Sequence, residues 1–255
     1  MRRLASALCF MLLLTPVAAG QTQPQKAAPA APAKQKPAPG FIDRVLKFLG
    51  ISDSPGTLKG PGDEVKSGAL WVADLGSHTT HAITRGEGYR SPVSLPESND
   101  ILALSGSDVM RISPSGETKK LYSIAGITKL VAGSADNLDT VLILLTGDAG
   151  GHPRIGLLSV SIGKVTPLPY DPNSGADLQM VENLEGWNRS YGDKQIYVQR
   201  QTKQALSGPL EWSDVFLKAA GQNPVNVSRC DGANCGQPTL STDGRLLIFV
   251  KSETE

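Results

Sequence analysis

The feature that most restricts the fold of this chain is a repeated pattern, in which a polar turn is followed directly by a strongly apolar strand. The pattern occurs four times, at residues 95–104, 134–145, 190–198 and 241–250. Ser, Asp, Asn and Gly tolerate the tight turn, and the strands that follow are apolar on both faces. Such strands need cover on both sides, as in neighbouring sheets. The repeats therefore predict an all-β domain over residues 68–255.

A second element alternates with the first and consists of a strand, a polar turn and another short strand. Its copies lie at residues 69–84, 107–122, 154–166 and 213–227. Successive copies are roughly 40 to 60 residues apart, which is the length of a four-stranded propeller blade. Four copies of each element predict a β-propeller of four blades, and we expect no helix after residue 68.

The order of the elements indicates how the domain closes. The domain starts with the second element, at residues 69–84, and ends with the first, at residues 238–252, so the two ends together complete one blade. We expect residues 246–250 to pair with residues 70–74, because closure removes exposed sheet edges. The alternatives are an irregular β-sandwich and an incomplete propeller that closes with a second chain.

The last repeats resemble those of TolB-type (WD40-like) β-propellers. Residues 238–249, Pro-Thr-Leu-Ser-Thr-Asp-Gly-Arg-Leu-Leu-Ile-Phe, are similar to the family repeat Pro-x-Trp-Ser-Pro-Asp-Gly-x-x-Ile-Ala-Phe. Residues 213–217, followed by Gly221 and residues 227–228, resemble its Asp-Ile-Tyr-Val strand and its outer strand. The resemblance implies a TolB-like propeller domain over residues 68–255.

The resemblance is uneven along the chain. It is good over residues 190–252 and weak over residues 68–169. The chain lacks the α/β domain that precedes the propeller of TolB, and it has too few repeats for six blades. Repeats of this type also occur as accessory domains of serine peptidases, so the resemblance implies a fold and leaves the role open.

The N-terminus has the three parts of a secretory signal peptide. A basic start at residues 1–3 is followed by an apolar run at residues 4–14 and by small residues at 17–19. A membrane-spanning helix needs about 20 apolar residues, and this run ends at Thr15. We therefore expect residues 1–19 to be cleaved, leaving an exported protein, periplasmic or secreted, with no transmembrane segment.

Three segments connect the signal peptide to the β domain. Residues 20–40 are rich in Pro and Ala, with almost nothing to bury, and predict a disordered linker. Residues 41–50 predict a short amphipathic helix that ends at Gly50. Its apolar face must dock either on its own domain or on a partner or membrane surface, since so short a helix is marginal alone. Residues 51–67 predict a loop.

The mature chain keeps two of the three cysteines. Cys9 leaves with the signal peptide, so Cys230 and Cys235 remain, and an even pair in an exported protein predicts a disulfide. In the chain-entropy model, a disulfide that closes a loop of this size stabilises the folded protein by about 2 kcal/mol. The alternatives are a redox pair, which favours two intervening residues, and half of a zinc site, for which no second Cys or His pair is available.

The sequence offers no catalytic, cofactor or metal constellation. His78 and His81 are three residues apart on a predicted hairpin, which places them on opposite faces, and His152 lies in a loop. The Asp-bearing turns lack the ligand series of a calcium loop, and no Gly-x-Ser-x-Gly motif occurs. The absence of a basic run with interleaved aromatic residues excludes a typical nucleic-acid surface.

Aromatic residues provide the remaining candidate for a binding surface. Trp187, Arg189 and Tyr191 form a possible partner-binding surface, since Trp, Tyr and Arg dominate interface energies. The alternative for Trp187 is packing between blades, and we expect such packing for Trp212, just ahead of a strand. The sequence predicts a non-enzymatic propeller that binds a protein or an envelope component. The alternatives are a hydrolase or lyase, with carboxylates at the propeller opening, and a carbohydrate-binding module.

Overall fold

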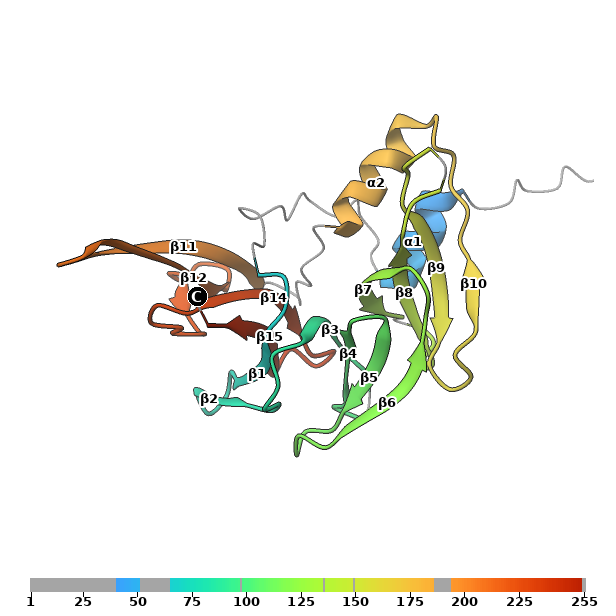
Figure 1. Ribbon diagram of the computed structural model, residues 1–255. Helices are drawn as coiled ribbons and strands as arrows, with labels where there is room; N and C mark the ends of the chain where they lie inside the picture. The colour runs from blue at the N-terminus through green and yellow to red at the C-terminus, as the bar shows by residue number, and fades with distance from the viewer. Residues whose placement is uncertain are drawn as a thin grey trace, which may run out of the picture. The chain divides into compact units, whose positions relative to one another are not determined.

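The computed structural model describes residues 40–50, 65–96, 98–134, 136–148, 150–185 and 194–253 (Figure 1). The predicted signal peptide at residues 1–19 lies outside the described residues, as do residues 20–39 of the predicted linker and residues 51–64 of the predicted loop. The described residues form fifteen strands and two helices. The strands make four antiparallel sheets, so the domain is all-β as predicted.

Two sheets from the middle of the chain are meanders of four consecutive strands. The first contains β3 (Tyr89–Ser94), β4 (Ile101–Ser105), β5 (Asp108–Ile112) and β6 (Thr118–Ser123). The second contains β7 (Ile127–Gly133), β8 (Thr140–Leu145), β9 (Arg154–Ser159) and β10 (Val165–Pro167). The predicted apolar strands are β4 and β8. The strands before them, β3 and β7, escaped prediction because register shifts interrupt their pairing and their apolar pattern.

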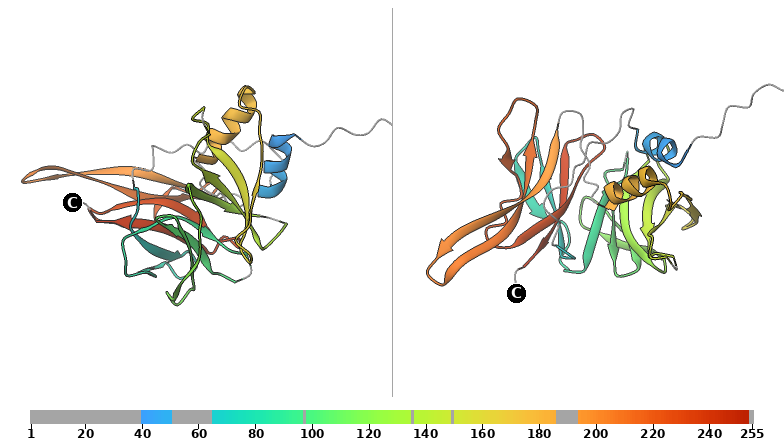
Figure 2. Two further views of the ribbon diagram at one scale, coloured as in Figure 1. Left: turned by 45° about the vertical axis from the view of Figure 1, so that its right-hand side comes forward. Right: turned by 90° about the horizontal axis from the view of Figure 1, so that it is seen from above.

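The third sheet contains β11 (Gln195–Ala205), β12 (Gly208–Lys218) and β13 (Val225–Asn226). β11 and β12 pair along their whole length, and Figure 2 shows this long hairpin extending beyond the short strand β13. Residues 186–193, ahead of Lys194 and β11, lie outside the described residues. The described part of this sheet therefore has three strands rather than the four of the other sheets.

The fourth sheet, which we call the composite sheet, is built from both ends of the domain. Its strand order is β14 (Asn234–Leu240), β15 (Leu246–Ser252), β1 (Ala69–Asp74) and β2 (Thr79–Ala82). β1 and β15 are antiparallel, with Leu70 opposite Val250 and Asp74 opposite Leu246. The predicted pairing of residues 70–74 with residues 246–250 is confirmed.

Gly68 allows the chain to enter this ladder closely. A Cβ atom at Gly68 would overlap the backbone carbonyl of Lys251, on the neighbouring strand. The Gly68 N–H also donates to the Tyr89 carbonyl at 2.9 Å, and the Tyr89 N–H donates back to Gly68 at 3.0 Å. Gly68 therefore links the composite sheet to β3 at a point where no side chain fits.

The two helices cover one face of the sheet β7–β10. On β8, Val141 and Ile143 pack with residues of the sheet β3–β6, whereas Leu142 and Leu144 face the helices α1 (Phe41–Leu49) and α2 (Gly175–Glu185). Figure 2 shows both helices beside this sheet. The strand is buried on both faces as predicted, but its second cover is helical. No helix in the described part of the chain is long and apolar enough to cross a membrane.

Helix α2 corrects the expectation that no helix follows residue 68. Ser174 caps its start, with its hydroxyl oxygen accepting the Asp177 N–H at 3.3 Å. Met180, Val181 and Leu184 form its buried face, at helical spacing. The polar residues between them weaken the amphipathic pattern of this segment, so the sequence did not predict a helix here.

Helix α1 docks on its own domain. Phe41 and Val45 are buried, and the Phe41 ring lies 5.4 Å from the ring of Tyr170. The Arg44 guanidinium donates to the Pro169 carbonyl at 2.8 Å. The helix ends at Gly50 as predicted, and Gly50 adopts the left-handed conformation, with φ of 66°. These contacts decide between the two docking alternatives that the sequence left open.

A closed propeller ring is not shown by the structure. In a closed ring, a further blade would cover the face of β7–β10 that points away from β3–β6. Helices α1 and α2 pack on that face instead, in one apolar cluster with Val131, Leu142 and Ile155. The described sheets therefore have blade-like topology, with one end of the stack covered by helices.

Replacing Gly68 by Ala should destabilise the domain by about 1–3 kcal/mol, because the added methyl group overlaps the backbone of Lys251. Gly175→Ala is the matched control, since a Cβ atom there meets nothing within 4 Å at the first turn of α2. Urea denaturation of both variants measures the difference. Equal stability of the two variants would contradict the close approach at Gly68.

Candidate functional site

A groove of about 750 Å³ lies between the composite sheet and the sheet β11–β13. One wall comes from β1, β2 and β15, and the other from β12, β13 and the segment that follows β13. The residues that matter most for its chemistry are Trp71, Asp74, Lys194, Val225, Arg229 and Lys251. A concave site of this size is typical of a ligand-binding pocket.

Trp71 and Lys251 form the first wall through the pairing of the two ends of the domain. Lys251 lies opposite Ala69 in the ladder, so Trp71, two residues further along β1, is its diagonal neighbour on the same sheet face. The Lys251 ammonium lies 4.7 Å from the centre of the Trp71 ring, in a cation–π contact. The half-buried indole thus offers an apolar surface next to a positive charge.

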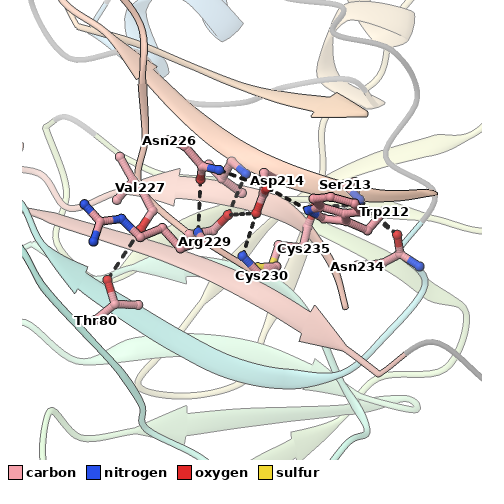
Figure 3. Close-up of a disulfide and its surroundings, with 12 residues drawn as sticks. Thr80, Trp212, Ser213, Asp214, Asn226, Val227, Arg229, Cys230, Asn234 and Cys235 are labelled. Atoms are coloured by element: carbon pink, nitrogen blue, oxygen red, sulfur yellow. Dashed lines mark hydrogen bonds between the residues drawn. A yellow bond between two sulfur atoms is a disulfide. The ribbon is translucent and has the colours of Figure 1, made fainter. Parts of the chain in front are cut away.

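Asp214 is buried behind the second wall and fixes the residues that form it. It is only 2% exposed, and each of its carboxylate oxygens accepts two hydrogen bonds (Figure 3). The donors are Ser228 Oγ at 2.8 Å and the Cys230 N–H at 2.7 Å on one oxygen, and Asn226 Nδ2 at 2.9 Å and Trp212 Nε1 at 2.8 Å on the other. A buried carboxylate requires such partners, and in return it fixes the segment that carries them.

The segment after β13 is also fixed covalently. Cys230 and Cys235 form the predicted disulfide, with 6.2 Å between their Cα atoms, and both are buried. Arg229 has a φ of 46°, and its N–H donates to Asn226 Oδ1 at 3.0 Å. This turn leaves the Arg229 side chain exposed at the groove. Its guanidinium has no hydrogen-bond or ion-pair partner within the described ranges.

Asp74 is the acidic residue among the described residues of the groove. Its carboxylate accepts hydrogen bonds from the turn that follows it. Donation from the backbone N–H groups of Ser77 and Gly76 lowers the pKa of the Asp74 carboxyl, and the charge of Arg245 adds to this effect. The two hydrogen bonds measure 2.9 and 2.8 Å. Asp74 therefore stays ionised and acts as the cap of the turn between β1 and β2.

The cations outnumber the carboxylate in the groove. Among the described residues, Lys194, Arg229 and Lys251 line it with their positive charges, against the negative charge of Asp74. Lys194 Nζ also donates to the Gly244 carbonyl at 3.1 Å, which ties the third sheet to the composite sheet. The electrostatics of the groove favour an anionic ligand.

The predicted site residues have different outcomes. The disulfide Cys230–Cys235 is confirmed. Trp212 packs in the cluster of β11, β12, β14 and β15 as expected, although it lies within β12 rather than ahead of a strand. The predicted surface of Trp187, Arg189 and Tyr191 lies outside the described residues.

The three histidines lie on different structural elements. His78 lies at the rim of the groove, in a turn with a φ of 58°, whereas His81 is exposed on β2. His152 lies in the loop between β8 and β9. Within the described ranges, no group of three or more His, Cys, Asp or Glu side chains is placed to hold a metal ion.

Sequence reasoning missed the groove itself. Trp71 and Lys251 come from opposite ends of the domain, and only the predicted pairing of those ends could have brought them together. Asp214 belongs to the strand motif at residues 213–217, but no local signal shows that its carboxylate accepts hydrogen bonds from Asn226, Ser228 and Cys230.

Comparisons with known proteins give weak resemblances at the level of fold. No protein-family model matches the sequence, and no curated protein matches it. A protein assigned as TolB from Agrobacterium tumefaciens is 12% identical, with a TM-score of 0.35, over 71% of this chain and 60% of that chain. TolB from Acinetobacter baumannii is 18% identical, with a TM-score of 0.34, over 73% and 49% of the two chains. The AtxE2 isopeptidase is 14% identical, with a TM-score of 0.28, over 68% of this chain and 27% of that chain.

Replacing Asp214 by Asn should cost about 1–3 kcal/mol of stability, because the amide nitrogen faces donors that the carboxylate oxygen accepted. Asp148→Asn is the control, since this exposed carboxylate caps a surface turn. We expect this variant to change the free energy of unfolding by no more than about 0.5 kcal/mol. Denaturant unfolding measures both effects. An Asp214→Asn variant as stable as the control would show that Asp214 does not organise this wall.

Proposed function

We propose that this chain is an exported, non-enzymatic binding module that holds another protein or a component of the cell envelope in its groove. In this proposal the four sheets are the blades of a propeller-type domain, and the composite sheet joins the two ends of the domain. The protein works in the periplasm or outside the cell. The signal-peptide pattern at residues 1–19 and the disulfide Cys230–Cys235 support an oxidising compartment.

The groove is the observation that carries the proposal. It combines an apolar ring at Trp71 with cations on separate elements, and two rigid walls hold it. One wall rests on the β1–β15 ladder, and the other rests on Asp214 and the disulfide. Rigid walls reduce the conformational entropy that binding has to overcome.

The chemistry of the groove supports binding over catalysis. A hydrolase or lyase would need converging groups whose surroundings push their pKa values apart. Among the described residues that line the groove, Asp74 is the one carboxylate, and donation from its own turn lowers its pKa. Such a carboxylate is a poor general acid or base at neutral pH.

Chemical crosslinking in the native cell envelope, followed by mass spectrometry, should capture a defined partner protein. Binding surfaces of this type associate specifically, so the same partner should recur in independent preparations and should be absent when the chain is deleted. Recovery of no partner, together with binding of the purified protein to a glycan array, would replace the proposal with a carbohydrate-binding function.

A further inference from the structure

We propose that the groove binds an acidic peptide segment of a partner protein, in an extended conformation. This inference rests on the proposed binding function and names the chemistry of the partner. Its first support is the convergence of charge. Lys194 directly precedes β11, Arg229 lies in the turn before the disulfide, and Lys251 lies on β15, so three separate elements bring cations to one groove.

Arg229 is the most suitable of these cations for a carboxylate. Its backbone is fixed by the bond to Asn226 and by the neighbouring disulfide at Cys230, while its guanidinium is exposed. A guanidinium binds a carboxylate through two parallel hydrogen bonds. Lys251, which rests on the Trp71 ring, offers a second positive charge on the opposite wall.

The apolar part of the groove indicates a ligand that carries apolar side chains next to its negative charges. Trp71 is half-buried on one wall, and Val225 is 54% exposed on the other. An inorganic anion would leave both surfaces in water. A peptide that carries an aromatic or aliphatic residue next to Asp or Glu would cover them and gain the energy of apolar burial.

The edges of two sheets favour a peptide over a lipid headgroup. β2 is the last strand of the composite sheet, β13 is the last strand of its own sheet, and both contribute residues to the groove. Within the described part of the chain, neither strand has a second partner strand. An extended peptide can therefore pair with the open side of one of these strands, whereas a headgroup cannot. The Thr80 hydroxyl reaches the Val227 carbonyl at 3.5 Å, so the two edges lie close together.

The test selects phage-displayed random linear peptides on the purified full-length exported protein. We expect the enriched peptides to combine Asp or Glu with an aromatic or aliphatic residue. The double variant Arg229→Glu with Lys251→Glu should bind them about tenfold more weakly or worse, because it reverses both charges that face the ligand. Lys119→Glu with Lys164→Glu is the matched control, since it changes the net charge equally at exposed positions outside the groove.

Several results would overturn the inference. These are enrichment of neutral or basic peptides, equal weakening by the groove and control variants, and binding of anionic lipid vesicles or inorganic phosphate without any peptide enrichment. Circular dichroism checks the fold of each variant. Arg229→Gln replaces the double variant if that variant fails to fold, and it should weaken binding in the same direction.

The outcome separates this inference from the proposed function. A crosslinked envelope partner with no acidic selection in the groove would leave the binding function standing and refute the acidic peptide. Acidic peptides that depend on Arg229, without any captured envelope partner, would support the chemistry of the groove and refute the proposed envelope role.

Discussion

The antiparallel ladder between β1 and β15 is the interaction on which the rest of the structure depends. It joins residues from the two ends of the domain in one register, from Ala69 opposite Lys251 to Asp74 opposite Leu246. The ladder completes the composite sheet and removes an open edge from both terminal hairpins. It also places Trp71 beside Lys251, so one wall of the groove exists only while the ends are paired.

The second wall is held differently. Side-chain hydrogen bonds and a disulfide fix it, rather than a continuous strand ladder. β13 is too short to hold the segment after it. The buried carboxylate of Asp214 gathers the donors of that segment, and the disulfide limits the freedom of its far end. The low dielectric of the interior strengthens these bonds and makes the loss of any partner costly. The groove is therefore rigid on both sides for unrelated reasons.

The sequence predicted what local patterns encode. The two repeated elements together located most strands, and the order of the repeats predicted the pairing of β1 with β15. The strands β3, β7 and β14 were missed because bulges break their periodicity, and α2 was missed because polar residues dilute its apolar face. The disulfide was predictable from the count of cysteines. The groove was not, because its walls are distant in sequence and Asp214 acts through contacts that no spacing reveals.

The most direct test of the ladder uses cysteines at Ala69 and Lys251. Opposite residues of an antiparallel pair lie about 4.5–5.5 Å apart at Cα, within the range of a disulfide. Ala69→Cys combined with Lys251→Cys should oxidise to one bond within a single chain, mapped by mass spectrometry in a monomeric fraction, while Ala69→Cys alone stays reduced. Free thiols in the double variant, or a bond that joins two chains, would contradict the pairing of the ends within one chain.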